Sequence, residues 1–153
     1  RGWLGRLIGA TVSGQRPLAA QAPLGWVWVE DAAQGIARAV DAGDDGGRYV
    51  LCGDTFSSHK LLSHIAATAN VKPPRAVSPS LALAEAALRT AMARPLGRRP
   101  GLAMDGARFL TKGFEVSGAA ARDELEFEYT PAARWVPAVA RAYRLKPVPA
   151  RGH

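Results

Sequence analysis

Apolar residues recur along much of this chain at the three- and four-residue spacing typical of amphipathic helices. In the last such segment, the spacing places Trp135, Val136, Val139 and Tyr143 on one side, with Pro137 in the second turn. Stretches rich in Gly and Pro separate the helical segments. The pattern predicts helices over 3–12, 58–69, 79–94 and 103–111, one that Ser117 caps and that runs through Leu125, and a last one from about Pro131.

A different pattern interrupts the helices in the first third of the chain. Trp26–Val29 and Arg48–Cys52 are short runs of aromatic and aliphatic residues, which predict buried strands. Between them, Ile36, Ala37 and Val40 share one side of a predicted helix. Strand, helix, turn and strand is the order of a βαβ crossover. The sequence therefore predicts an α/β fold in which these two strands are parallel.

The chain has 153 residues, which suits one domain or part of a larger one, and 48% of them are hydrophobic, which is enough for a sizeable core. No apolar run reaches the length that crosses a bilayer, so we predict no membrane partner. The first residues lack an initiator Met and the apolar centre of a signal peptide, so we expect them to come from the middle of a longer protein. The single Cys52 rules out an internal disulfide and favours a reducing, cytoplasmic location.

A formal net charge of +7 raises the hypothesis of nucleic-acid binding. Most arginines, however, stand singly within helical patterns, and the cluster consists of Arg94, Arg98 and Arg99. Aromatic residues do not interleave with them as a base-stacking platform requires. The sequence therefore disfavours a nucleic-acid partner. A steep salt dependence of duplex binding would be the signature of one.

Residue types that commonly carry catalysis are few and scattered. His59 and His64 are five residues apart on a predicted helix, whereas zinc-binding pairs use a spacing of four. Cys52 ends a predicted strand, where a small buried hydrophobe fits, and has no His close to it in the sequence. Glu30 and Asp31 are adjacent and point in different directions, and we expect Asp31 to be the N-cap of the following helix. These patterns predict no metal site and no catalytic residue.

Three residues stand out as candidate substrate contacts. Arg16 lies in a Gly/Pro loop ahead of the first predicted strand, where a guanidinium can clamp an anionic or carbonyl group. Trp26 and Trp28 alternate with aliphatic residues, and a pair of indoles at the end of a strand suits a ligand pocket. Packing against neighbouring helices explains the two indoles equally well, so both interpretations remain open.

The segments described above also follow a familiar order. Residues 27–35 (VWVEDAAQG) are similar to a VHVDDVAxG segment, and residues 117–127 are similar to a closing signature SxKARxxLG followed by Tyr or Phe. Residues 47–53, 55–65 and 131–143 match the strand and the two helices that accompany these motifs. In this order they resemble the extended short-chain dehydrogenases/reductases, the NAD-dependent epimerase/dehydratase relatives that include dihydroflavonol-reductase-like and 3β-hydroxysteroid-dehydrogenase-like enzymes.

Two departures from that family pattern stand out. Trp28 stands where His is usual, and Glu126 stands where Gly is usual. The Gly of the family ends a helix in the left-handed conformation. Glu126 is therefore expected to cost about 1 kcal/mol there, or to mark a different turn.

The resemblance implies the C-terminal half of a Rossmann-type enzyme: late parallel strands and a mostly helical substrate-binding lobe over 1–146, followed by a flexible tail over 147–153. The cofactor fingerprint GxxGxxG is absent, since Gly2, Gly5 and Gly9 do not match its spacing. The catalytic Tyr-x-x-x-Lys of the family is absent too, and with it the proton donor for hydride transfer. NAD or NADP is implied for a full-length relative, and none is expected to bind this chain alone.

The leading hypothesis is therefore the substrate-binding portion of an NAD(P)-dependent oxidoreductase or epimerase that acts on a small carbonyl, hydroxyl or sugar-nucleotide substrate. Its partner would be the missing N-terminal half, in the same polypeptide or in another chain. The alternative is a non-catalytic structural or interaction subunit derived from such a reductase.

Overall fold

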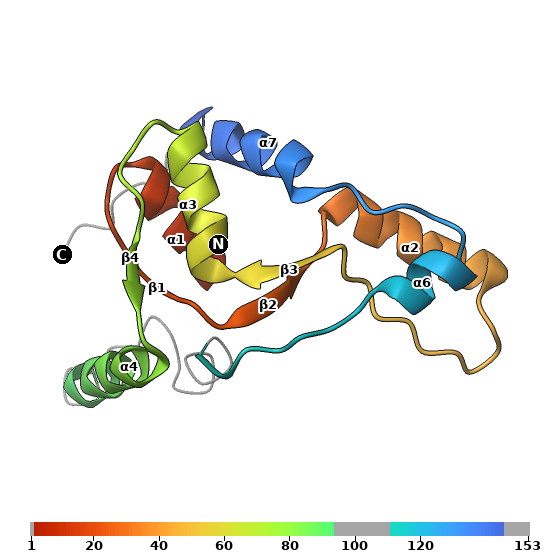
Figure 1. Cartoon of the computed structure of the whole chain (residues 1–153), viewed down its shortest axis with the longest axis horizontal. Coiled ribbons are helices and arrows are strands. Elements are labelled where there is room, and N and C mark those ends of the chain that lie inside the picture. The colour runs from red at the N-terminus through yellow and green to blue at the C-terminus, as the bar shows by residue number, and fades with distance from the viewer. Residues whose placement is uncertain (1, 94–110, 146–153) are drawn as a thin grey trace.

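The structure is a computed structural model, and it describes residues 2–93 and 111–145. Three helices pack together at one end of the molecule, two lie at the other end, and one lies apart from both groups (Figure 1). In that order they are α1 (Trp3–Val12), α3 (Ser58–Thr68) and α7 (Ala132–Leu145), then α2 (Val29–Ala42) and α6 (Ala119–Glu124), then α4 (Pro79–Ala93).

These helices confirm most of the helical predictions to within one or two residues. The predicted helix over 103–111 lies almost entirely outside the described residues, as do the tail over 147–153 and the cluster of Arg94, Arg98 and Arg99. The prediction that Ser117 caps this helix was wrong by one residue: the N-cap is Gly118, and the Ser117 hydroxyl accepts a hydrogen bond from the amide of Ala119 at 3.2 Å.

In the part of the chain that the structure describes, four short strands form two separate pairs. β1 (Leu18–Ala20) runs parallel to β4 (Arg75–Val77), and β2 (Pro23–Trp26) runs antiparallel to β3 (Asp54–Ser57). The α/β class is therefore confirmed, and one of its pairs is parallel. The pair that includes Trp26 is not, because Trp26 pairs with Asp54 in an antiparallel register.

The predicted strands and their parallel crossover were therefore wrong in position and in direction. β2 ends at Trp26 and α2 already begins at Val29, while 48–52 forms neither a helix nor a strand. The apolar pattern of 48–52 has a different cause, since Tyr49 and Leu51 pack against helices rather than within a sheet. The amide of Gly53 donates to the carbonyl of Trp26 at 2.9 Å, and the strand that pairs with β2 begins only after this contact.

The main core lies between α1, α3 and α7. Leu62 and Ile65 of α3 are fully buried in it, facing Ile8 of α1 and Val136 of α7. The sides predicted to face inward on α3 and α7 are thus the buried ones. The guanidinium of Arg144 also donates to the carbonyl of Ala69, which satisfies a free carbonyl at the C-terminus of α3.

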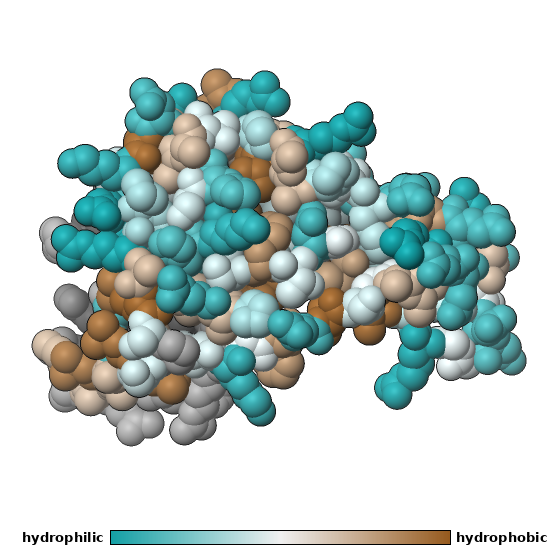
Figure 2. All heavy atoms as spheres, in the orientation of Figure 1, coloured by the Kyte–Doolittle hydropathy of each residue, from teal (hydrophilic) through white to brown (hydrophobic). Residues whose placement is uncertain are grey.

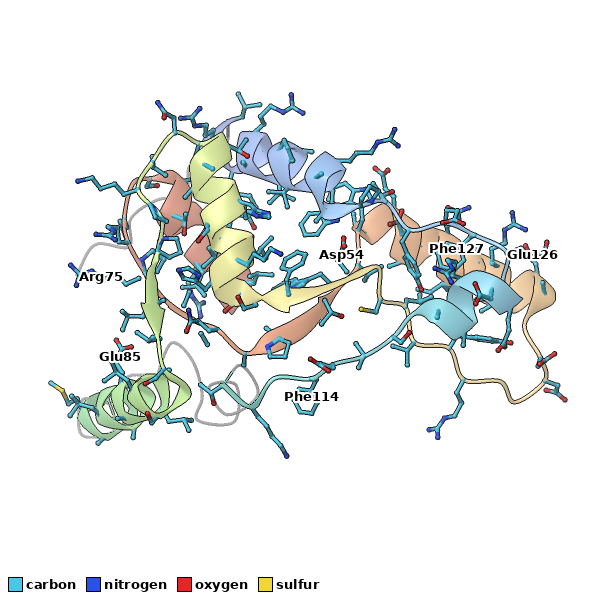
Figure 3. All side chains as sticks on the ribbon, viewed as in Figure 1. Asp54, Arg75, Glu85, Phe114, Glu126 and Phe127 are labelled. Atoms are coloured by element: carbon cyan, nitrogen blue, oxygen red, sulfur yellow. The ribbon has the colours of Figure 1, made fainter. Side chains whose placement is uncertain are left out.

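A second, smaller core lies between α2 and α6. It is formed by Leu125 and Phe127, with Tyr49 and Leu51 of the segment 48–52 packed against them. Figure 3 shows Phe127 beside α6 on the side of α2. The close fit depends on Gly35 of α2, because a Cβ at this position would lie 2.6 Å from the side chain of Leu51. This core is distinct from the cluster at the α3 end.

Two helices end on residues in the left-handed conformation. Asn70 follows α3 with a φ of 54°, and Glu126 follows α6 with a φ of 50°. The amide of Phe127 donates to the carbonyl of Arg122 at 3.3 Å, which is the bond that closes a Schellman turn. The sequence prediction for Glu126 is confirmed: a side chain stands where the backbone favours glycine.

Apolar side chains also remain on the surface. On α4 they are Leu81, Leu88 and Met92, and Figure 2 shows hydrophobic surface in this part of the molecule, at the lower left. Within the described ranges, none of the helices combines the length and the apolarity needed to span a bilayer.

Candidate substrate-binding site

A row of four stacked aromatic rings connects β2, β3 and α7. Trp26 stacks on Phe56, with ring centroids 5.9 Å apart, Phe56 stacks on Trp135 at 6.4 Å, and Trp135 stacks on Trp28 at 6.2 Å. Trp135 is buried, whereas the other three rings are half-buried. The structure therefore brings Trp26 and Trp28 into one row, which we call the aromatic row. The chain turns from strand into helix between them, so both indoles reach the same ring cluster.

The aromatic row is fixed by its neighbours. The indole Nε1 of Trp26 donates to the carbonyl of Phe56 at 2.8 Å, so that this polar edge is already satisfied. On α3, the Lys60 ammonium lies 5.9 Å from the centre of the Phe56 ring, and His64 lies tilted against the same ring at 6.5 Å. Sequence reasoning missed this pair of basic groups. The signal available was that Lys60 comes in the first turn of a helix that follows β3 directly.

Arg16 lies in a loop ahead of the first strand, as predicted. It is exposed in the loop between α1 and β1, and its Nε donates to the carbonyl of Pro73 at 3.0 Å. This bond ties the loop before β1 to the segment before β4, and so supports the parallel pair. None of the contacts found in the described residues joins Arg16 to the aromatic row, and its role in binding stays a prediction.

Two carboxylates hold the segment that leads into α7. Asp31 is only 4% exposed and accepts from both the amide and the hydroxyl of Thr130, at 2.7 and 2.8 Å. Asp54 accepts from the amide of Ala132 at 2.8 Å, at the positive N-terminal end of α7. Asp54 lies where the two ends of the molecule meet (Figure 3). These bonds determine where α7, and with it Trp135, meets the aromatic row.

The prediction that Asp31 is the N-cap of α2 was therefore wrong. The N-cap is Trp28, with no side-chain hydrogen bond, and Asp31 lies within the first turn. Its partner is 99 residues away in the sequence, so no local pattern identifies it. Glu30 is exposed and Asp31 is buried, so the two adjacent carboxylates do point in different directions, as predicted.

A hollow of about 240 Å³ lies between the start of β3, the extended residues before α6, and α6 itself. Polar groups that line this hollow already bond to other groups of the protein. The hydroxyl of Thr55 donates to the carbonyl of Val116 at 3.3 Å, and Arg122 pairs with Asp123 at 2.8 Å on the surface. The lining residues are Cys52, Gly53, Thr55, Val116, Ser117, Gly118, Ala119, Arg122 and Tyr129.

Tyr129 closes one side of this hollow. Its hydroxyl accepts from the amide of Cys52 at 3.3 Å and donates to the carbonyl of Gly118 at 3.2 Å. Burial raises the pKa of Tyr129 above its usual value, and the hydrogen bond from Cys52 partly opposes this shift. Ala133 stands four residues after Tyr129, so the lysine of a Tyr-x-x-x-Lys pair is missing here. We assign this tyrosine a structural role rather than that of a proton donor.

No cluster of metal-ligating side chains accompanies these features. Across 2–93 and 111–145, three or more His, Cys, Asp or Glu side chains nowhere gather closely enough to hold an ion. Cys52 is buried, as predicted for a small apolar residue. The rings of Trp26, Trp28 and Phe56 pack against the main core, in agreement with the packing interpretation of the two indoles, and their half-buried surface lies beside Lys60 and His64.

Three solved structures resemble this fold along nearly its whole length. One is the crystal structure of gox2253, with a TM-score of 0.70 and 27% identity over 92% of this chain. Another is a nucleoside-diphosphate-sugar epimerase from Pseudomonas aeruginosa, with a TM-score of 0.64 and 25% identity over 92%. The enzyme WbmH from Bordetella bronchiseptica, in complex with NAD⁺, has a TM-score of 0.59 and 18% identity over 97%, a likeness of fold alone.

The chain spans less than half of each of these proteins: 43% of gox2253, 41% of the epimerase and 42% of WbmH. No protein-family profile matches the chain, and no curated protein matches its sequence. These likenesses show an α/β fold related to part of the fold of the Pseudomonas nucleoside-diphosphate-sugar epimerase.

Proposed function

We propose that this chain is the substrate-binding portion of an NAD(P)-dependent oxidoreductase or epimerase, and that residues outside 1–153 supply cofactor binding and catalysis. The observation that carries the proposal is the likeness to gox2253 and to the nucleoside-diphosphate-sugar epimerase, at 25–27% identity over 92% of the chain. On this proposal, residues 1–146 act as one C-terminal lobe in a cytoplasmic enzyme.

The substrate class proposed is a small carbonyl or hydroxyl compound or a sugar nucleotide. The likeness to the Pseudomonas nucleoside-diphosphate-sugar epimerase supports the sugar nucleotide. The aromatic row supports it as well, because half-buried rings bind the apolar face of a sugar or a base, and the basic groups beside Phe56 attract phosphate. Trp26, Trp28 and Arg16 remain the proposed contact residues.

Cofactor binding is proposed to lie outside the chain. NAD⁺ is bound in the WbmH structure, but the described residues include no glycine fingerprint at the start of a helix. We expect the isolated 153-residue chain to show no saturable binding of NADPH by cofactor fluorescence. Saturable binding would contradict the proposal that cofactor binding lies outside residues 1–153.

Titration of the chain with UDP-glucose, followed by tryptophan fluorescence, tests the substrate assignment. We expect saturable quenching, at least tenfold weaker binding in Trp28→Ala, and a smaller loss in Arg16→Ala. Arg141→Ala is a matched control, since Arg141 is exposed on α7. Absence of saturable binding, or equal losses in Arg16→Ala and Arg141→Ala, would remove the support for these contacts.

The alternative of a non-catalytic interaction subunit is favoured by one observation: exposed apolar residues on α2, where Val29 and Val40 are 67% and 82% accessible. An interaction subunit needs such a surface but no ligand. Failure of UDP-glucose to bind, together with a partner that binds this surface, would favour the alternative.

A further inference from the structure

Opposite charges collect in different parts of this molecule. In the described residues, the stretches 2–29, 55–84 and 129–145 contain no Asp or Glu, and they include α1, α3 and α7, which pack together at one end (Figure 1). Their Lys and Arg side chains are all exposed: Arg6, Arg16, Lys60, Lys72, Arg75, Arg134, Arg141 and Arg144. The acidic residues lie mostly in 30–54 and 111–128, which include α2 and α6. The fold therefore gathers arginines that stand singly in the sequence onto one basic end.

Two of these cations stand where they lower the stability of their own helix. Lys60 lies in the first turn of α3 and Arg134 in the first turn of α7, and neither first turn contains an acidic residue. The N-terminus of a helix carries a partial positive charge, which favours Asp or Glu there and disfavours Lys or Arg. Helix stability therefore does not explain these two positions, whereas an acidic partner would offset their cost.

The outer face of α7 carries the most regular part of this charge. Arg134 and Arg141 are seven residues apart, so they lie on one side of the helix, about 10 Å apart along its axis. Ala138 lies between them, and Leu145 follows on the same side with 83% of its surface exposed. The opposite side faces the main core, where Val136 is buried. The outer face thus places a small residue between two cations, which lets another helix approach closely.

The chemistry of this face favours a protein that presents carboxylates. All the cations of α7 are arginines, and a guanidinium binds a carboxylate through two parallel hydrogen bonds. Arginine is enriched in protein–protein interfaces, whereas lysine is depleted. The aromatic residues of α7, Trp135 and Tyr143, pack in the main core. The outer face therefore lacks the rings on which single-stranded nucleic acid stacks.

We propose that the outer face of α7 docks an acidic helix of a partner protein. A helix laid along α7, with Asp or Glu every seven residues, would place carboxylates at the spacing of Arg134 and Arg141. Ala138 leaves room for the backbone of this helix, and Leu145 offers an apolar contact at the end of the face. The inference goes beyond the proposed function, because it needs neither a substrate nor a cofactor.

Fluorescence anisotropy with a labelled peptide and the full 153-residue chain tests the inference. The probe is a peptide of about 20 residues, long enough to form a helix, built from Ala, Gln and Glu with Glu in one stripe of seven-residue repeat. We expect saturable binding that falls at least tenfold in Arg141→Glu. Arg38→Glu is the matched control, since it changes the charge equally at an exposed position on α2. Equal losses in the two variants would overturn the inference, because net charge alone would explain them.

Arg134→Glu separates binding from folding. We expect weaker binding of the peptide together with a higher midpoint of thermal unfolding, because a carboxylate is favoured in the first turn of α7. If the role of Arg134 were only structural, the variant would have a lower midpoint and would bind the peptide as the parent chain does. That result would overturn the inference.

Other occupants of this face are distinguished with the same variants. Tighter binding of duplex DNA, or of phosphatidylserine vesicles, that Arg141→Glu abolishes would overturn the inference by assigning the face to phosphate groups. Equal binding of a peptide with the same composition in scrambled order would also overturn it. Arg141→Ala should weaken binding of the helical peptide and leave binding of UDP-glucose unchanged, so the docking inference and the proposed function fail separately.

Discussion

The two ends of the molecule bury their apolar residues in different ways. Around α3, three helices enclose a core in which Leu62 and Ile65 are inaccessible to solvent. Around α2, one face of the helix is packed, while Ile36 on another face remains 62% exposed. The first end encloses its apolar residues on all sides, whereas the second leaves apolar surface in water. The core at the α2 end is therefore one-sided.

Substitutions of two isoleucines test this comparison most directly. Ile65→Ala, at the enclosed end, is expected to lower the free energy of unfolding by about 2–5 kcal/mol, because it leaves a cavity among fully packed neighbours. Ile36→Ala, on the exposed apolar face of α2, should change the free energy of unfolding by less than about 0.5 kcal/mol. Urea unfolding of both variants measures the difference. A large loss of unfolding free energy in Ile36→Ala would mean that this face of α2 is buried.

The next largest effect is expected at Asp31, which connects the two ends of the molecule. Asp31→Ala removes two hydrogen bonds to Thr130 and leaves the partly buried amide of Thr130 without that partner, so we expect a loss of about 2 kcal/mol. Glu30→Ala, one residue earlier and exposed, is the matched control and should be close to neutral. Equal effects in thermal unfolding would show that the Asp31 bonds do not hold the segment before α7.

A smaller effect of opposite sign is expected at the end of α6. Glu126→Gly should stabilise the protein by up to about 1 kcal/mol, because glycine adopts a positive φ without steric cost. Glu124→Gly, within the same helix, should instead destabilise it by about 1 kcal/mol. Urea unfolding distinguishes the two. Destabilisation by Glu126→Gly would argue that the carboxylate makes a contact that outweighs the strain.

The smallest effect is a dependence on pH at the hollow. Because the pKa of Tyr129 is raised in the folded state, the unfolded chain loses this proton first as the pH rises. The contribution of Tyr129 is therefore complete below about pH 10, the ordinary pKa of tyrosine, and is lost as the pH rises through the higher folded value. Unfolding measured between pH 8 and 11 should show this loss in the parent chain and less of it in Tyr129→Phe. The same slope in both would exclude Tyr129 as its source.

Local patterns predicted the helices well. The spacing of Leu61, Leu62 and Ile65 identified α3, and the spacing around Trp135 identified α7, because a helix must bury one face. The left-handed turn at Glu126 was expected from the family resemblance, because the family has Gly at this position. The candidate site was predictable only in part: Trp26 and Trp28 stood out, but their stacking with Phe56 and Trp135 did not.

The sequence by itself determined the helical segments, the α/β class and the resemblance to reductases and epimerases, because each depends on residues close together in the chain. Only the tertiary structure decided that β2 pairs antiparallel with β3, and that Asp31 binds Thr130 rather than capping its own helix. The apolar residues at 48–52 showed a preference for burial but not for a partner. A short apolar run packs equally well against helices or in a sheet, and only the surrounding chain decides which it meets.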